Sequence, residues 1–161
     1  INNDLTPKVI QCDIQGHNGL AFSPDDEWMF TSDTPNGVIY RAPLDAQGEP
    51  GGREIFRQFE EGEGIPDGAA MDTEGCYWSA MFDGWRIARF SPQGEQLEEY
   101  RLPVRCPTMV CFGGEEMKTL FITTTRENMD AEEVAKYPLS GAIFTLPVDV
   151  AGMKKKPFIE R

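Results

Sequence analysis

Two oxygen-bearing side chains, those of Asn18 and Asp67, stand at matching places in a sequence that repeats itself, each where a short apolar run begins. An amide oxygen together with a carboxylate suits a hard cation such as Ca²⁺, Mg²⁺ or Mn²⁺, and Zn²⁺ also accepts oxygen ligands. The alternative is that both residues only shape their local turns, which Asn and Asp favour. The two residues therefore indicate either a metal site or a pair of turns, depending on the elements that carry them.

The third copy of the repeat has Thr108 at the equivalent position. A hydroxyl is a weak ligand, so we expect Thr108 to serve packing. His17 directly precedes Asn18 and is the only histidine of the chain. Neighbours in a strand point to opposite faces, so His17 and Asn18 are not expected to line the same channel. We expect His17 on the surface or in the core, away from any substrate.

The repeat itself predicts how these residues are positioned. Each copy runs from an apolar strand through a turn rich in Asp, Pro or Gly into an aromatic and β-branched strand, followed by two more strands. The first strands are expected at 18–22, 67–71 and 108–112, the second at 28–32, 76–80 and 119–123, the third at 38–41, 86–90 and 142–146, and the clearest outer strands at 54–59 and 96–102. Four strands per unit with a period of about 40–50 residues predict the blades of a β-propeller, whose innermost strands line a central channel.

The number of units predicts an incomplete ring. Three units fit in 161 residues, and the strand predicted at 8–12 resembles the outer strand of a blade whose inner strands are absent. The third unit also inserts a helix-like stretch at 129–136. Propellers close with roughly four to eight blades, so three blades leave apolar faces and strand edges open. We therefore expect one all-β, partial β-propeller domain over residues 1–161, completed by the N-terminal half of a longer chain or by a second copy in a homodimer.

Composition and charge argue against several functions. The formal net charge is −12 and the only basic run is residues 154–156, so nucleic-acid binding is not expected. No apolar stretch approaches the roughly 18 residues of a membrane helix, so no membrane partner is expected. Four cysteines without metal-site spacing, and a first segment unlike a signal peptide, predict a cytoplasmic protein. Cys76 and Cys111 lie in apolar runs and are expected in the core.

Several segments, in order and at matching spacing, resemble the gluconolactonase family, which includes regucalcin. The segments are residues 18–25, 65–68, 72–80, 107–114, 130–132 and 141–144. The resemblance spans nearly the whole chain but only the C-terminal half of a family member. It implies three four-stranded blades of a six-bladed propeller with a divalent cation in its channel, and hydrolysis of sugar lactones such as gluconolactone.

The resemblance also implies roles for individual residues. The family's cation is held by a Glu from the first blade, by an Asn that matches Asn18 and by an Asp that matches Asp67. The Glu and the family's substrate-binding Arg and Asn have no counterpart in the half that this chain resembles. Asp67 is then both a metal ligand and the catalytic group that accepts a proton from the attacking water. The competing expectation is a non-catalytic or inactive fragment, a metal-binding or interaction half-propeller, because two protein ligands hold a cation weakly.

Overall fold

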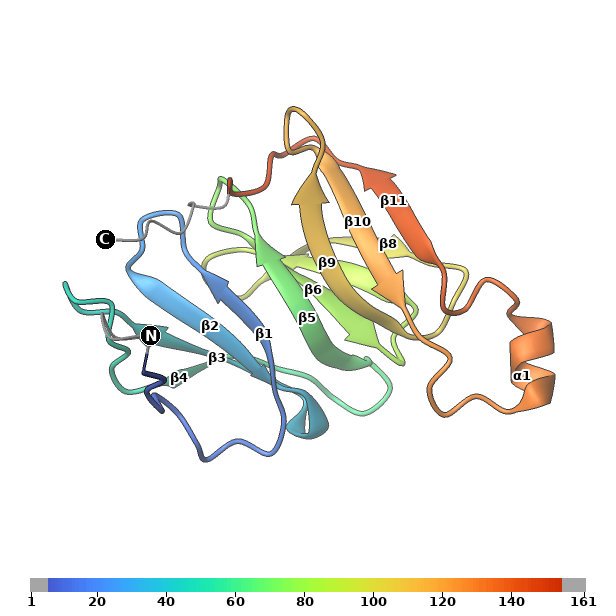
Figure 1. Ribbon diagram of the computed structural model, residues 1–161, viewed down its shortest axis with the longest axis horizontal. Coiled ribbons are helices and arrows are strands. Elements are labelled where there is room, and N and C mark those ends of the chain that lie inside the picture. The colour runs from blue at the N-terminus through green and yellow to red at the C-terminus, as the bar shows by residue number, and fades with distance from the viewer. Residues whose placement is uncertain (1–5, 155–161) are drawn as a thin grey trace.

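Three antiparallel β-sheets stand side by side in the computed structural model, with their inner strands next to one another (Figure 1). The structure describes residues 6–154. Each sheet is one blade, and its strands run outward in sequence order from the inner strand. The all-β propeller repeat that the sequence predicts is confirmed, with sheets of four, four and three strands.

Two blades have all four strands. The first blade consists of β1 (His17–Phe22), β2 (Trp28–Asp33), β3 (Val38–Pro43) and β4 (Glu54–Gln58), and the 3₁₀ helix η1 (Thr34–Asn36) joins β2 to β3. The middle blade consists of β5 (Ile65–Met71), β6 (Tyr77–Phe82), β7 (Arg86–Phe90) and β8 (Gln96–Arg101). Every residue of β7 is buried, as expected for a strand that is covered on both faces.

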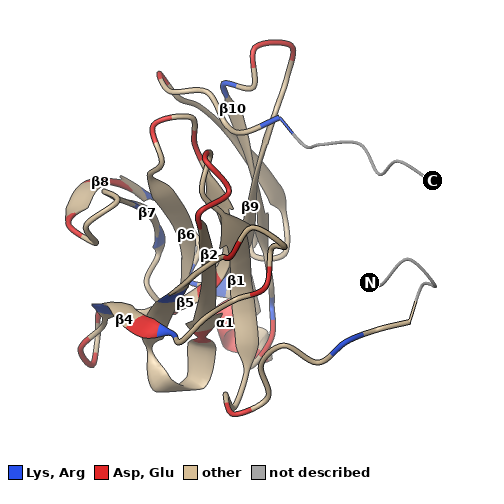
Figure 2. Cartoon of the chain, turned by 90° about the vertical axis from the view of Figure 1, so that its left-hand side faces the viewer, with Lys and Arg blue, Asp and Glu red and all other residues tan. Residues whose placement is uncertain are grey.

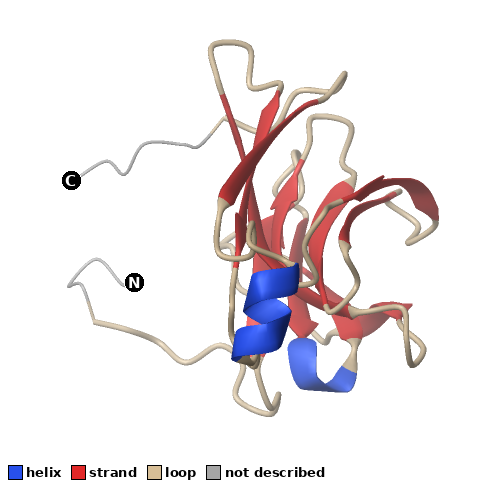
Figure 3. Cartoon of the chain, turned by 90° about the vertical axis from the view of Figure 1, so that its right-hand side faces the viewer, coloured by secondary structure: helices blue, strands red, loops and turns tan. Residues whose placement is uncertain are grey.

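The last blade departs from this plan. It consists of β9 (Pro107–Gly113), β10 (Thr119–Thr124) and β11 (Ile143–Pro147), with helix α1 (Ala131–Lys136) between β10 and β11 (Figure 3). Asp130 caps α1 by accepting a 2.8 Å hydrogen bond from the backbone N–H of Glu133, and the predicted helix-like insertion is confirmed. The sequence predicted four strands in every unit. Within residues 6–154 the last blade has only three, and β11 is the edge strand of its sheet.

The chain after β11 crosses to the middle blade and does not return along its own sheet. The backbone N–H of Thr73 donates a 2.9 Å hydrogen bond to the carbonyl of Ala151. Gly152 lies so close to the ring of Phe112 that any side chain at this position would overlap the ring. This crossing segment, residues 148–153, therefore fastens the last blade to the turn that follows β5, and it is why no fourth strand follows β11 there.

The segment at 8–12, predicted as a strand, is not one. It lies along the loop between β3 and β4, where Lys8 Nζ is 2.6 Å from Glu49 Oε2. Just beyond it, Asp13 pairs with Arg53 through both carboxylate oxygens. A lone strand is not stable without a sheet to join, and the described residues contain no blade before β1. Residues 8–12 therefore have the sequence of a strand but no neighbouring strand to pair with in the described part of the chain.

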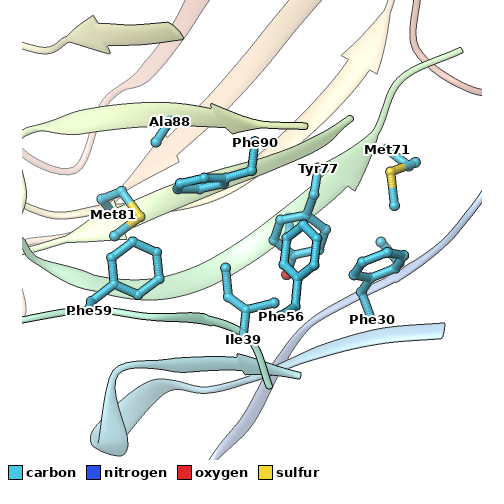
Figure 4. Close-up of a cluster of buried hydrophobic side chains, with 11 residues drawn as sticks. Phe30, Ile39, Phe56, Phe59, Met71, Tyr77, Met81, Ala88 and Phe90 are labelled. Carbon is cyan, nitrogen blue, oxygen red and sulfur yellow. The ribbon is translucent and has the colours of Figure 1, made fainter. Parts of the chain in front are cut away.

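Two apolar clusters join the blades. The first, between the first and middle blades, contains Phe30, Ile39, Phe56, Ala69, Met71 and Tyr77 among its buried members (Figure 4). The second, between the middle and last blades, contains Trp78, Ile87, Val110, Phe112, Leu120 and Ile122. The ring centroids of Phe30 and Tyr77 are 5.5 Å apart, and those of Trp78 and Phe112 are 5.6 Å apart. Aromatic contacts of this kind add to the area burial that holds packed sheets together.

A buried ion pair fixes the middle blade from within. Asp72 accepts hydrogen bonds from Arg89 Nε at 2.9 Å and from Trp78 Nε1 at 2.8 Å. Its other oxygen accepts from the backbone N–H groups of Glu74 and Cys76, both at 2.9 Å. Four donors converge on one fully buried carboxylate, so its charge is compensated inside the blade.

The four cysteines are free thiols. Cys76 is buried as predicted, whereas Cys111 is only half-buried because it also lines a hollow beside the inner strands. Asp and Glu gather mainly in the loops at the ends of the strands (Figure 2). Within residues 6–154, no helix has the length and apolar character needed to cross a membrane.

Candidate functional site

Each inner strand carries one extra residue near its start. The register of β1 on β2 shifts between Asn18 and Ala21, and that of β5 on β6 shifts between Pro66 and Ala69. The pairing of β9 with β10 shifts at the equivalent place, beside residue 108. A β-bulge bends its strand and re-aims a side chain, and bulges are common next to active sites. The repeat therefore puts the same local distortion at the same end of all three inner strands.

The bulges bring Asn18 and Asp67 into contact. Asn18 Nδ2 donates a hydrogen bond to Asp67 Oδ1, and Asn18 Oδ1 accepts one from the N–H of Gly19 at 3.1 Å. Thr108 does not join this pair, because its hydroxyl lies 2.8 Å from the hydroxyl of Thr123 on the neighbouring strand. The structure thus places side by side the two residues that the sequence singled out, and it gives Thr108 a partner within its own blade.

The carboxyl group of Asp67 is electrostatically unusual. Partial burial raises its pKa to about 6, because the charged form loses hydration. The hydrogen bond from Asn18 works in the opposite direction, and the negative charge of Glu127 in the loop before α1 adds to the rise. Sequence reasoning missed Glu127, which lies far from Asp67 along the chain and carries no motif. A desolvated carboxylate of this kind is stabilised by a positive charge beside it.

Hydrogen bonds between the first and middle blades hold the two bulges in place. The hydroxyl of Tyr77 donates to the carbonyl of Gly19 at 2.7 Å, and that of Thr34 donates to the carbonyl of Pro66 at 2.7 Å. Gly19 has a φ of +56°, and an added Cβ would lie 2.9 Å from the carbonyl oxygen of Asp67. Only glycine satisfies this backbone and this close approach. The geometry of the pair is therefore set by the packing of the first blade on the middle blade.

A hollow of about 470 Å³ lies beside the pair. Its lining includes Ile10, His17, Asn18, Leu20, Met29 and Met109. His17 and Asn18 both line this hollow, whereas the expectation for the two residues concerned the central channel and stays a prediction. A mostly apolar wall with a few polar groups is typical of a small-molecule site.

The pair offers two donors to a cation. Turning the amide group of Asn18 would place its oxygen, in place of its nitrogen, beside the Asp67 carboxylate, and amide and carboxylate oxygens are ligands that hard cations prefer. Among residues 6–154, no group of three His, Cys, Asp or Glu side chains converges on one point. By donor type and charge the pair fits a hard divalent cation, with the remaining coordination positions left to other groups.

Comparisons with known proteins agree with one another. Residues 1–126 match the family model described as the SMP-30/Gluconolactonase/LRE-like region. The 6-deoxy-6-sulfogluconolactonase of Pseudomonas putida is 55% identical over 152 residues, which cover 94% of this chain and 52% of that protein. Regucalcin of Gallus gallus is 34% identical over 144 residues, covering 88% and 48%. The crystal structure of regucalcin from Agrobacterium tumefaciens, a calcium-binding protein, matches 89% of this chain and 50% of its own, with a TM-score of 0.85 and 31% identity. The chain spans about half the length of the curated relatives it matches.

Proposed function

The chain belongs to the SMP-30/Gluconolactonase/LRE-like family, and from this premise we propose that the propeller to which it contributes is a divalent-metal-dependent sugar lactonase. The observation that carries the proposal is the contact between Asn18 and Asp67 at the bulges of neighbouring inner strands. The names of the relatives support the reaction class, because the Pseudomonas putida protein is a lactonase that shares 55% of its aligned residues with this chain.

We assign Asn18 and Asp67 as ligands of a cation, which is Ca²⁺, Mg²⁺, Mn²⁺ or Zn²⁺. When bound, such a cation supplies Lewis acidity that polarises a lactone carbonyl and lowers the pKa of a water molecule. Asp67 contributes negative charge to the site and accepts the proton that the attacking water loses. Without a cation, burial raises the pKa of Asp67 to about 6, and a bound cation would favour the charged carboxylate and lower this pKa.

The substrate class can be narrowed by the same relative. Its name specifies a gluconolactone with a sulfonate at C6. We therefore propose 6-deoxy-6-sulfogluconolactone as the first substrate to test and gluconolactone as the second. Turnover of gluconolactone alone would support lactone hydrolysis but would contradict the sulfonated lactone as the substrate.

The test is an assay of acid release from the lactone, with and without a chelator, on the wild type and on Asp67→Asn. The variant keeps the shape of the side chain but removes its charge, so we expect turnover to fall by roughly 100-fold or more and cation affinity to fall with it. Asp25→Asn, in the exposed turn after β1, is the matched control and should leave both unchanged. Undiminished turnover in Asp67→Asn would remove the assignment of Asp67.

A second candidate is a non-catalytic half-propeller that binds a cation or a partner. It is favoured by the donor count, since the described part of the chain supplies two ligands to the site. Calorimetric titration with Ca²⁺ and Mn²⁺, run beside the lactone assay, separates the two candidates. Cation binding without turnover favours the non-catalytic candidate, whereas turnover that a chelator abolishes favours the lactonase.

A further inference from the structure

The inner strands of the described chain meet at two joints, which can be compared residue by residue. β1 packs against β5 where the first blade meets the middle blade, and β5 packs against β9 where the middle blade meets the last (Figure 1). The first joint contains the contact between Asn18 and Asp67, and the second has Asp67 and Thr108 at the equivalent positions. The chain therefore contains two copies of one joint, with and without the pair of candidate ligands.

The backbones approach one another closely in both joints. A Cβ added to Gly19 would lie 2.9 Å from the carbonyl oxygen of Asp67, and one added to the equivalent Gly68 would lie 2.6 Å from the carbonyl oxygen of Thr108. Each glycine therefore lets its inner strand touch the next one. What differs between the two joints is the set of side chains around the glycine.

Three hydroxyl groups link the two blades of the first joint at the bulges. Each donates a hydrogen bond across the joint to a backbone carbonyl: Ser32 to that of Asp67 at 3.2 Å, Thr34 to that of Pro66 at 2.7 Å and Tyr77 to that of Gly19 at 2.7 Å. Ser32 and Tyr77 are fully buried, so bulk water does not compete for their hydrogen bonds. The three carbonyls belong to Asp67 itself or to a direct neighbour of Asn18 or Asp67. Each hydrogen bond therefore acts on the backbone that carries the pair.

The second joint has apolar side chains at the places of these hydroxyl groups. Strand register gives the equivalents of Ser32, Thr34 and Tyr77, in that order, as Ala80, Phe82 and Leu120. Ala80 and Leu120 are fully buried in the cluster between the middle and last blades, and the sulfur of Met109 lies against Gly68. A joint of this repeat therefore packs without the three hydroxyl groups. Blade packing in general does not explain why the first joint has them.

We propose that Ser32, Thr34 and Tyr77 are positioning residues of the candidate cation site. The inference rests on the proposed function, because it takes Asn18 and Asp67 as the ligands. These two side chains come from different sheets and lie 49 residues apart in the sequence, so they stay in contact only while the bulges of β1 and β5 keep their relative position. The three hydroxyl groups fix that position through the backbone and act on the ligands without touching the cation.

A positioning role differs measurably from a purely structural one. Loss of a buried hydroxyl leaves its carbonyl partner unsatisfied, which lowers the stability of the protein in either case. Loss of a group that orients metal ligands also lowers metal affinity, typically by roughly 10-fold to 100-fold. Stability alone therefore does not test the proposal. The test needs readouts at the Asn18–Asp67 pair, one of which must be independent of cation and substrate.

The experiment removes one hydroxyl group at a time. Tyr77→Phe and Thr34→Val keep the shape of the side chain, and Thr34→Ser keeps the hydroxyl group. Thr124→Val is the matched control, because Thr124 donates a hydrogen bond of the same 2.7 Å length to a backbone carbonyl within the last blade. Calorimetric titration with Ca²⁺ and Mn²⁺ measures cation affinity. Nitrogen-15 NMR of the Asn18 side-chain amide reports its hydrogen bond to Asp67 with no cation present.

We expect Tyr77→Phe and Thr34→Val to weaken cation binding by roughly 10-fold or more and to move the Asn18 amide signal toward that of an exposed asparagine. Thr34→Ser and Thr124→Val should match the wild type in both readouts. A wild type that binds neither cation would count against the proposed function, and the amide signal would then decide the positioning role by itself. An unchanged amide signal and unchanged affinity in Tyr77→Phe and Thr34→Val would overturn the proposal, even if both variants lose stability. Equal effects in Thr124→Val would overturn it as well.

Discussion

The middle blade is covered on both faces and the last blade on one, and equivalent residues of the repeat behave differently in the two. Ile87 and Ile143 have the same side chain at the same register position, yet the first is buried and the second largely exposed. β7 is buried along its whole length, and its counterpart β11 alternates between exposed and half-buried residues. The difference teaches that burial in this repeat is decided by the neighbouring blade, because the residue type alone predicts the same environment for both.

The strongest way to break the middle blade is to remove the carboxylate at its centre. Asp72→Ala removes the fully buried partner of Arg89, which keeps only its more exposed partners Glu74 and Glu98, and it also orphans Trp78 Nε1. We therefore expect the free energy of unfolding to fall by about 3–5 kcal/mol. Urea unfolding measures this loss. Glu74→Gln removes an exposed carboxylate bound to the same Arg89 and should cost less than about 1 kcal/mol. Equal losses for the two variants would contradict the distinction between a buried and an exposed partner.

The comparison is sharpened by one substitution made at both equivalent positions. Ile87→Ala opens a cavity between the middle and last blades and should cost about 2–5 kcal/mol. Ile143→Ala removes a side chain that solvent already reaches and should stay within about 0.5 kcal/mol in dilute solution. Urea unfolding of both variants measures the two losses, and equal losses would contradict the difference in burial between Ile87 and Ile143.

Amide hydrogen exchange should separate the two blades without any mutation. The N–H groups of β7 lie between two strands, whereas β11 has a free edge in the described chain. We expect the slowest amides of β7 to exchange about 100-fold more slowly than those of β11, a difference of about 2.7 kcal/mol in opening free energy. Similar protection of both strands in dilute solution would mean that β11 is covered.

The smallest expected effect is a pH dependence that belongs to the middle blade. The hydrogen bond from Tyr100 and the charge of Arg89 hold the pKa of Glu98 below its ordinary value, which is about 4.3 in an unfolded chain. A lowered folded-state pKa gives stability that is present above the unfolded pKa and is lost as the pH falls through the folded one. Tyr100→Phe should therefore flatten the loss of stability between neutral and acidic pH.

Glu98 is partly exposed, so we expect the flattening to be less than about 1 kcal/mol. The measurement is urea unfolding of wild type and Tyr100→Phe at several pH values between about 3 and 7, a range that brackets the unfolded pKa of glutamate. An equally steep decline in both proteins would show that the Tyr100 hydrogen bond does not set this pKa.

The repeat pattern predicted the parts of the fold that depend on local sequence. Turn residues and β-branched runs placed the strands of all three sheets, and position in the repeat singled out Asn18 and Asp67, which are in contact. Their roles as ligands and catalyst stay a prediction. The prediction of a strand at 8–12 was wrong, because the described part of the chain contains no sheet for this segment to join. Contacts between distant segments were also invisible, among them the influence of Glu127 on Asp67 and the hydrogen bond from Tyr77 to Gly19.

The crossing segment at 148–153 has a consequence for the order in which the protein is made. The ribosome completes the strands of the middle blade well before it adds the residues that bond to the turn after β5. Until Ala151 emerges, the backbone N–H of Thr73 lacks its partner and Phe112 lacks the glycine that covers its ring. Folding during synthesis proceeds from the N-terminus, so the strands of the middle blade can pair early. The hydrogen bond from Thr73 to Ala151 forms only after the last blade has been synthesised. A nascent chain stalled before residue 148 should therefore be more sensitive to protease at the turn after β5 than the released protein.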